Sequence, residues 1–89
     1  MALFDLLGRR WTLRVLWELR DGGMTFRQLQ ARCEAMSSSV LNQRLRELRE
    51  AGVVEVHAQE GYKLTAEGEA LLRALAPLHE WAARWGERP

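Results

Sequence analysis

The sequence predicts a mainly α-helical domain with one small β-hairpin, and three observations support this fold class. Before residue 52, apolar side chains recur at helical spacing in three separate stretches. Residues 54–64 then alternate apolar and polar side chains, as two short strands do. From Thr65 the helical spacing returns. A helix-turn-helix unit, a hairpin and a further helix together form the element order of a winged helix-turn-helix domain.

The first expected helix spans residues 9–21. Trp11, Val15 and Leu19 form one apolar line along it, as a helix that packs on a core requires. The Gly22-Gly23 pair then ends the helical pattern.

The second expected helix begins after Thr25, because Thr25 and Gln28 have the spacing of a capping box. Leu29 and Cys33 fall on its inner stripe. A short connection over residues 34–36 separates it from the next helix. Two short helices joined by such a turn form a helix-turn-helix unit.

The third expected helix, over about residues 37–51, is the recognition-type helix of this unit. Ser37 is suited to cap its first turn, and Gly52 is suited to end it. Its apolar seam consists of Leu41, Leu45 and Leu48.

The face opposite this seam carries short or forked hydrogen-bonding side chains, namely Ser39, Asn42, Gln43 and Arg46. Asparagine and glutamine pair in two-pronged fashion with adenine, and arginine pairs with guanine, in the DNA major groove. The face therefore favours DNA reading. The alternative at this point is a polar surface helix that happens to hold an amide pair.

A small hairpin is expected after Gly52. Val54 and Val56 alternate with polar residues, as on a half-buried strand, and Tyr62 and Leu64 do the same on a second strand. The tip is expected at residues 58–61.

The last expected helix is long and begins after Thr65, which is suited to cap it. Pro77 removes one backbone hydrogen bond and should kink this helix. Its apolar residues recur about every 3.5 residues along the chain. They are Leu71, Leu75, Leu78, Ala82 and Trp85.

Four tryptophans lie on the first and last expected helices. Trp11 and one of the C-terminal pair are expected in the core, but 89 residues cannot easily bury four indoles in one monomer. Surplus tryptophans indicate a subunit interface. We therefore expect a homodimer whose interface includes Trp17, Leu71, Leu75, Leu78, Trp81 and Trp85.

Length and composition indicate one domain over residues 1–89 with one core. No apolar run approaches the roughly 20 residues that span a membrane, and the N-terminus lacks the layout of a signal peptide. A single cysteine excludes an internal disulfide and suits a reducing, cytoplasmic setting.

The net charge of +1 conceals a gradient along the chain. Residues 9–49 hold nine arginines and four acidic residues, whereas residues 50–89 hold four basic and seven acidic residues. An arginine-rich basic half indicates a nucleic-acid partner. About half of these arginines are expected instead to cover apolar neighbours or to pair with glutamate.

No pattern of catalysis or of metal binding is visible. Cys33, His57 and His79 lack metal-ligand spacing, and Cys33 is expected to act as a small core residue. Phosphate-binding loops, paired carboxylates at a cleft and nucleophile triads are absent as well. We therefore expect neither enzyme activity nor a metal or other cofactor.

Several motifs together resemble the HxlR-type winged helix-turn-helix regulators, from about residue 6 to residue 85. Their joint order is specific, although Leu-Thr-x-x-Gly alone occurs in many winged helices. The motifs are Gly8-Arg-Arg-Trp-Thr-Leu13, Phe26-Arg-Gln-Leu29, Met36-Ser37 with Val40-Leu-Asn-Gln-Arg-Leu-Arg-Glu-Leu48, Gly52-Val-Val-Glu55, Tyr62-Lys-Leu-Thr-Ala-Glu-Gly68 and Trp81.

The resemblance implies a bacterial or archaeal transcription regulator that binds double-stranded DNA as a homodimer. The first and last helices of each copy form the interface of the implied dimer. By position the resemblance places DNA contacts on Ser38, Ser39, Asn42, Gln43 and Arg46. Further candidates, for phosphate contacts, are Arg9, Arg10, Arg27, Arg44 and Arg49, with a structural role as the alternative for Arg44.

Two features depart from the family pattern. The cysteine with which thiol-sensing members react has no counterpart in Met1–Leu7. The expected wing is short and carries Glu60, which disfavours a strong minor-groove contact. A competing hypothesis is a winged helix that serves as a protein-interaction module without DNA binding. Neither the operator nor any small-molecule effector follows from the sequence.

Overall fold

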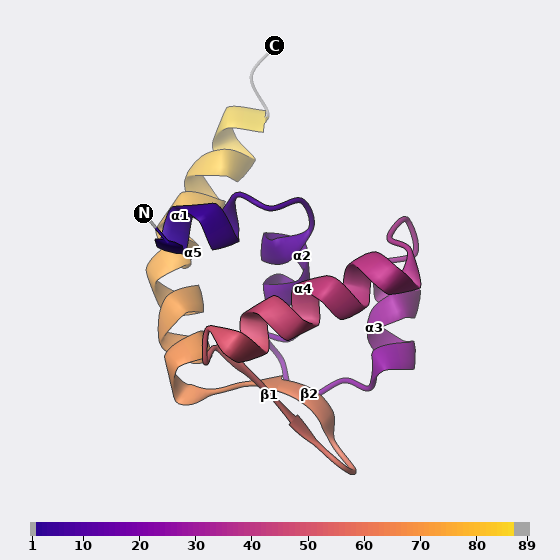
Figure 1. Cartoon of the computed structure of the whole chain (residues 1–89). Coiled ribbons are helices and arrows are strands. Elements are labelled where there is room, and N and C mark those ends of the chain that lie inside the picture. Colours follow the sequence, from indigo (N-terminus) through magenta and orange to yellow (C-terminus); the bar gives the residue numbers. More distant parts are fainter. Residues whose placement is uncertain (1, 87–89) are drawn as a thin grey trace.

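The computed structural model describes residues 2–86 and has the expected element order, with one additional helix at its start (Figure 1). None of its helices is long and apolar enough to cross a lipid bilayer, within the part of the chain that is described. The elements are α1 (Ala2–Leu7), α2 (Thr12–Glu18), α3 (Phe26–Arg32), α4 (Ser38–Glu50), β1 (Val54–His57), β2 (Gly61–Leu64) and α5 (Ala66–Gly86).

The start of α2 differs from the expected helix over residues 9–21. Trp11 has a φ of 78°, in the left-handed region, so the helix begins only at Thr12. A non-glycine residue in this region breaks the helical path. The separate helix α1, before this break, was not expected from the sequence.

The core lies where α2, α3 and α4 pack together and where the hairpin joins them. Leu16, Leu29, Leu41 and Leu48 are fully buried within it, and each contributes roughly 1.5–3 kcal/mol by leaving water. The core residues are Val15, Leu16, Leu19, Leu29, Cys33, Met36, Leu41, Leu45, Leu48, Val54 and Leu64.

The hairpin is antiparallel, with Val54 opposite Leu64 and His57 opposite Gly61. Met24 bridges to its second strand through two backbone hydrogen bonds with Tyr62, of 2.8 and 2.7 Å between nitrogen and oxygen. The wing is thereby fastened to the segment that precedes α3.

The burial of β1 differs from the expected alternation. Val54 is buried, but Val56 keeps 43% of its surface exposed. The hairpin has only two strands and projects from the core, as Figure 1 shows at its lower end, so the outer part of β1 has no layer to pack against.

Helix α5 is anchored at its N-terminal end and free at its other end. The Thr65 hydroxyl accepts a hydrogen bond from the Gly68 amide at 3.1 Å and donates one to the Gly52 carbonyl at 2.6 Å. The helix continues through Pro77, and its last turns extend away from the helix-turn-helix unit (Figure 1).

Candidate nucleic-acid interface

Helix α4 is held in place by its cap and by its leucine seam. Ser37 accepts a hydrogen bond from the Val40 amide at 3.3 Å, and Gly52, with φ 79°, follows its last turn. Leu41, Leu45 and Leu48 are buried. Because side chains project from all sides of a helix, burial of this leucine seam leaves the opposite face of α4 exposed to solvent.

Seven of the sequence-predicted DNA contacts are exposed on the helix-turn-helix unit, and six of these lie on α4. Among the described residues, Asn42, Arg46 and Arg49 make no side-chain hydrogen bond or ion pair. Their donors are therefore available to an external partner. These seven candidates are Ser38, Ser39, Asn42, Gln43, Arg46 and Arg49 on α4, and Arg27 on α3.

Gln43 differs from its neighbours because Glu47 binds it. The Gln43 side-chain nitrogen donates to a Glu47 carboxylate oxygen at 3.1 Å. Arg44 donates to the other oxygen at 2.6 Å, and Arg9 lies 3.5 Å from the carboxylate. The i, i+4 spacing of Gln43 and Glu47 was a signal that the sequence analysis missed.

Arg44 has a structural role. The sequence did not decide whether this residue contacts a phosphate or supports the fold. Its side chain is 16% exposed and its ion pair with Glu47 lies on the same helix. A guanidinium in this position has little surface to offer to a phosphate.

A second ion-pair cluster joins α2 to α3 around Glu18, whose side chain is 9% exposed. Arg14 approaches its carboxylate to 2.9 Å and Arg32 to 3.5 Å, and Arg14 also donates to the Arg32 carbonyl at 3.0 Å. The cluster holds α2, which precedes the helix-turn-helix unit, against α3, the first helix of that unit.

The arginines of residues 9–49 thus divide into two groups. Five of the nine pair with carboxylates, which agrees with the expected half. Within the described residues, the remaining four have no carboxylate partner. They are Arg10, which lies 5.2 Å above the Trp11 ring, Arg27, Arg46 and Arg49.

The wing flanks α4 and carries two carboxylates, Glu55 and Glu60, against one lysine, Lys63. Lys63 pairs with Glu60 at 3.3 Å, and His57 lies 2.8 Å from Glu55. Arg46 and Arg49 line a hollow between α4 and β1, together with Glu55. The carboxylates on this side repel phosphates, so α4 offers the better DNA-contacting surface.

Cys33 is buried at the end of α3, as expected of a small core residue. Burial raises the pKa of its thiol, and the nearby Arg14 guanidinium partly offsets this effect. The thiol therefore stays protonated at neutral pH. Within residues 2–86, no three His, Cys, Asp or Glu side chains lie together as metal ligands would.

The expected interface residues on α5 lie in two environments. Leu71 and Leu75 are half-buried, whereas Leu78, Trp81 and Trp85 are more than half exposed, and the two indoles stack with centroids 5.9 Å apart. The expectation that one of the C-terminal tryptophans enters the core is wrong, because the end of α5 extends past the core.

These elements define the class of winged helix-turn-helix proteins: a helix-turn-helix unit with an exposed amide-and-arginine face, then a hairpin, then a long helix. Within it, the chain belongs to the HxlR-like helix-turn-helix family, whose model matches residues 6–89. Its family and fold are those of DNA-binding transcriptional regulators.

Individual relatives agree with this assignment. YvaP of Bacillus subtilis, an uncharacterized HTH-type transcriptional regulator, is 33% identical over 87 residues, which cover 91% of this chain and 81% of YvaP. The quinone-bound structure of YodB from the same species has a TM-score of 0.86 at 31% identity, over 93% of each chain.

A possible HxlR family factor from Thermoplasma volcanium has a TM-score of 0.90 at 24% identity, over 99% of this chain and 84% of that one. At this identity the likeness concerns the fold.

Proposed function

We propose that this chain is a regulator without enzyme activity that binds duplex DNA sequence-specifically as a homodimer, with α4 in the major groove. The observation that carries the proposal is that Asn42 and Arg46 have no side-chain partner among residues 2–86. Both lie on the exposed face of α4, and the opposite face of this helix is buried in the core. Amide and guanidinium groups carried on a helix that is held by its packing match base edges in the major groove.

Phosphate contacts come from the arginines that have no carboxylate partner. Arg49 lies at the end of α4 and Arg27 at the start of α3, outside the run of base-reading residues along the chain. Contacts of this kind fix the register of the helix on the duplex, and the base contacts then supply specificity.

The homodimer is supported by the apolar end of α5. Leu78, Trp81 and Trp85 are 54%, 52% and 56% exposed, and they lie on a helix that extends beyond the body of the molecule. An exposed cluster of this kind marks an interaction site. A second copy, with the same face on its own α5, covers it by two-fold pairing.

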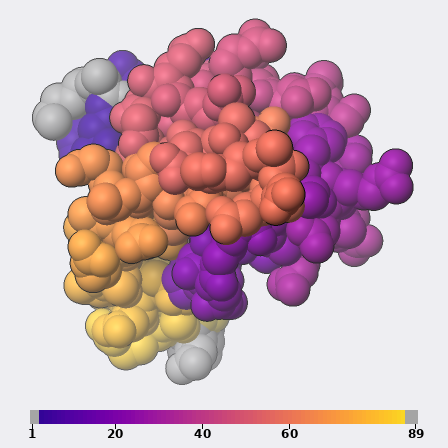
Figure 2. All heavy atoms as spheres, turned by 90° about the horizontal axis from the view of Figure 1, so that it is seen from below, coloured from indigo at the N-terminus to yellow at the C-terminus, as the bar shows by residue number. Residues whose placement is uncertain are grey.

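The two proposed surfaces do not compete for space. Figure 2 shows α4, in magenta and pink, along one edge of the molecule and the C-terminal end of α5, in yellow, at the opposite edge. Pairing through α5 therefore leaves both copies of α4 free, and two half-sites about one DNA turn or a small multiple apart are the expected target.

The alternative is a winged helix that docks on another protein. Docking surfaces are rich in exposed aromatic and large apolar side chains. On the described part of α4 the exposed face holds serine, amide, arginine and glutamate side chains instead. DNA is therefore the favoured partner.

Selection of bound sequences from a random duplex pool tests the proposal. Enrichment of a two-fold symmetric motif is the expected result. Recovery of unselected sequences at every salt concentration would contradict specific DNA binding and would favour the protein-interaction alternative.

A further inference from the structure

Glu47 lies at the centre of a network that reaches one of the proposed base-reading side chains. One of its carboxylate oxygens accepts a hydrogen bond from Arg44 at 2.6 Å. The other oxygen accepts one from Gln43 at 3.1 Å and lies 3.5 Å from the Arg9 guanidinium. Arg9 belongs to the turn between α1 and α2. Groups from two segments of the chain thus hold this carboxylate, whose side chain is only 14% exposed.

The network decides which way the Gln43 amide faces. A free glutamine samples both orientations of its terminal amide, because the last torsion of the side chain is broad and roughly two-fold. A carboxylate accepts hydrogen bonds and does not donate them, so the nitrogen of Gln43, and not its oxygen, faces Glu47. The amide oxygen and the second N–H of that nitrogen remain for an external partner.

These remaining groups match one base edge in the DNA major groove. Adenine presents an acceptor, N7, beside a donor, the N6 amino group, and therefore pairs with one N–H and one carbonyl oxygen. Guanine presents two acceptors, N7 and O6, which the outward oxygen of Gln43 would repel. Glu47 therefore disfavours the amide orientation that suits guanine and keeps the one that suits adenine.

We propose that Glu47 is a positioning residue for DNA specificity, which makes Gln43 select adenine over guanine. The inference rests on the proposed function, since it concerns the base contacts of α4. Glu47 lies four residues beyond Gln43, one helical turn along α4, so its carboxylate acts through the amide and does not itself touch the base.

Glu47→Gln tests this role, because it changes one carboxylate oxygen to a nitrogen at nearly constant shape. Arg44 donates at the shorter distance and keeps the remaining oxygen as its acceptor, while the exposed Arg9 can move aside. The new nitrogen then faces Gln43 and donates to its amide oxygen, which turns both N–H groups of Gln43 outward. The variant should therefore shift the preference from adenine towards guanine.

The measurement is the dissociation constant for four duplexes, derived from the selected site, that differ only at the base pair whose preference Gln43→Ala removes. The wild type should favour adenine over guanine about fivefold or more, and Glu47→Gln should reduce this ratio about fivefold or more. Fluorescence anisotropy at one salt concentration gives all four constants. A partial loss of fold would weaken binding to all four duplexes alike, so the ratio reports positioning and not stability.

Two controls separate positioning from other effects. Glu50→Gln removes a carboxylate from the exposed end of the same helix and should keep the wild-type ratio. In the Gln43→Ala background, Glu47→Gln should not change the ratio further, because the residue through which it acts is gone. Gln43 is exposed, so Gln43→Ala should fold as the wild type does and tests adenine selection independently of the stability of Glu47→Gln.

Three results would overturn the proposal while DNA binding is retained. They are an unchanged ratio in Glu47→Gln, no preference for adenine over guanine that depends on Gln43, or an equal change of the ratio in the Gln43→Ala background. A wild-type chain that binds none of the four duplexes at low salt would instead contradict the proposed function, and the inference would fall with it.

Discussion

Gln43 and Arg46 lie three residues apart on the exposed face of α4, yet their side chains are in different states. Gln43 donates to Glu47, whereas Arg46 has no side-chain partner among the described residues. The guanidinium keeps its full set of donors for DNA, while the amide has one N–H committed to Glu47. Arg46 is therefore the residue at which base selection should be most sensitive.

Arg46→Ala should weaken binding to the preferred site by about 1–3 kcal/mol and relax preference at one position per half-site. Fluorescence anisotropy on that site and on its single-base variants measures both effects. Arg73→Ala removes an exposed arginine from α5 and serves as the matched control. If Arg46→Ala kept both affinity and preference, α4 would not read bases through this face.

Glu47 makes a different kind of contribution, because it joins Arg9, Arg44 and Gln43. Glu47→Ala should lower the free energy of unfolding by about 1–3 kcal/mol, since it leaves the partly buried Arg44 without its acceptor. Urea denaturation monitored by circular dichroism measures the change.

Glu50→Ala is the matched control for this variant. Glu50 is exposed at the end of the same helix, and its removal should change stability by no more than about 0.5 kcal/mol. Equal effects of the two substitutions would show that the Glu47 contacts add nothing to the fold.

At the scale of elements, α5 combines two roles along its length. Its first turns are fixed by Thr65 and by Gly68, where an added Cβ would collide with the Val53 carbonyl oxygen. Its last turns carry exposed indoles. An anchored base gives the apolar end a defined direction, which a symmetric pairing requires.

Replacing Trp81 and Trp85 together by serine should weaken dimerisation about tenfold or more, because large aromatic residues carry much of the energy of an interface. Sedimentation equilibrium at micromolar concentration measures this. Glu80→Ser with Arg84→Ser alters the other side of the same helix and should leave the dimer intact. A wild-type chain that sediments as a 10.3 kDa monomer while binding DNA tightly would contradict the dimer.

On the scale of the whole molecule, the near-neutral net charge hides an arginine-rich part and an acidic part. The structure reduces the arginines available to DNA, because five are paired with carboxylates. Arg10, Arg27, Arg46 and Arg49 are the remaining ones in residues 9–49. Two copies of this set match on the order of 6–8 phosphates.

The logarithm of the DNA association constant should therefore fall with the logarithm of salt concentration at a slope of about −5 to −7. A salt titration on one fixed duplex determines this slope. Arg49→Ala should make it shallower by about 2 in the dimer, since each copy loses one phosphate contact. A slope near zero in the wild type would favour the protein-interaction alternative.

The sequence by itself determined the features that depend on neighbouring residues. The Thr25–Gln28 capping box, the Ser37 cap, the leucine seam of α4 and the turn at Gly61 all lie where the residues predicted them. Each depends on hydrogen bonds or side-chain spacing within a few residues, so a local pattern is sufficient to predict it. The polar face of α4 follows from the same periodicity.

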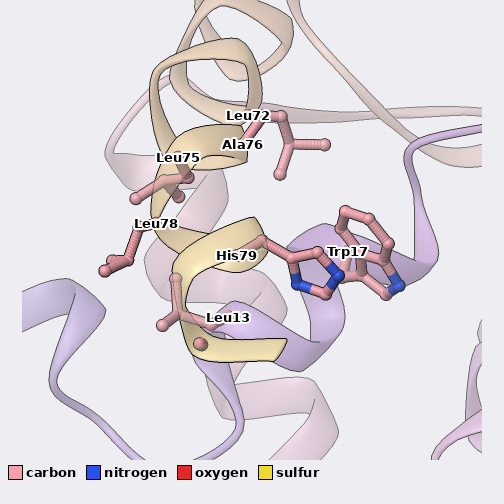
Figure 3. Close-up of a pocket in the computed structure, with 8 residues that line it drawn as sticks. Leu13, Trp17, Leu72, Leu75, Ala76, Leu78 and His79 are labelled. Carbon is pink, nitrogen blue, oxygen red and sulfur yellow. The ribbon is translucent and has the colours of Figure 1, made fainter. Parts of the chain in front are cut away.

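Only the tertiary structure decided the features that join distant segments. The left-handed Trp11, the exposure of Val56, the absence of either C-terminal tryptophan from the core and the stacking of Trp17 on His79 (Figure 3) were not predicted. Pairing of about half of the arginines was expected, but which of them pair with Glu18 and Glu47 was not predicted. The physical reason is that burial and pairing depend on which elements meet in space, and no local spacing along the chain contains that information.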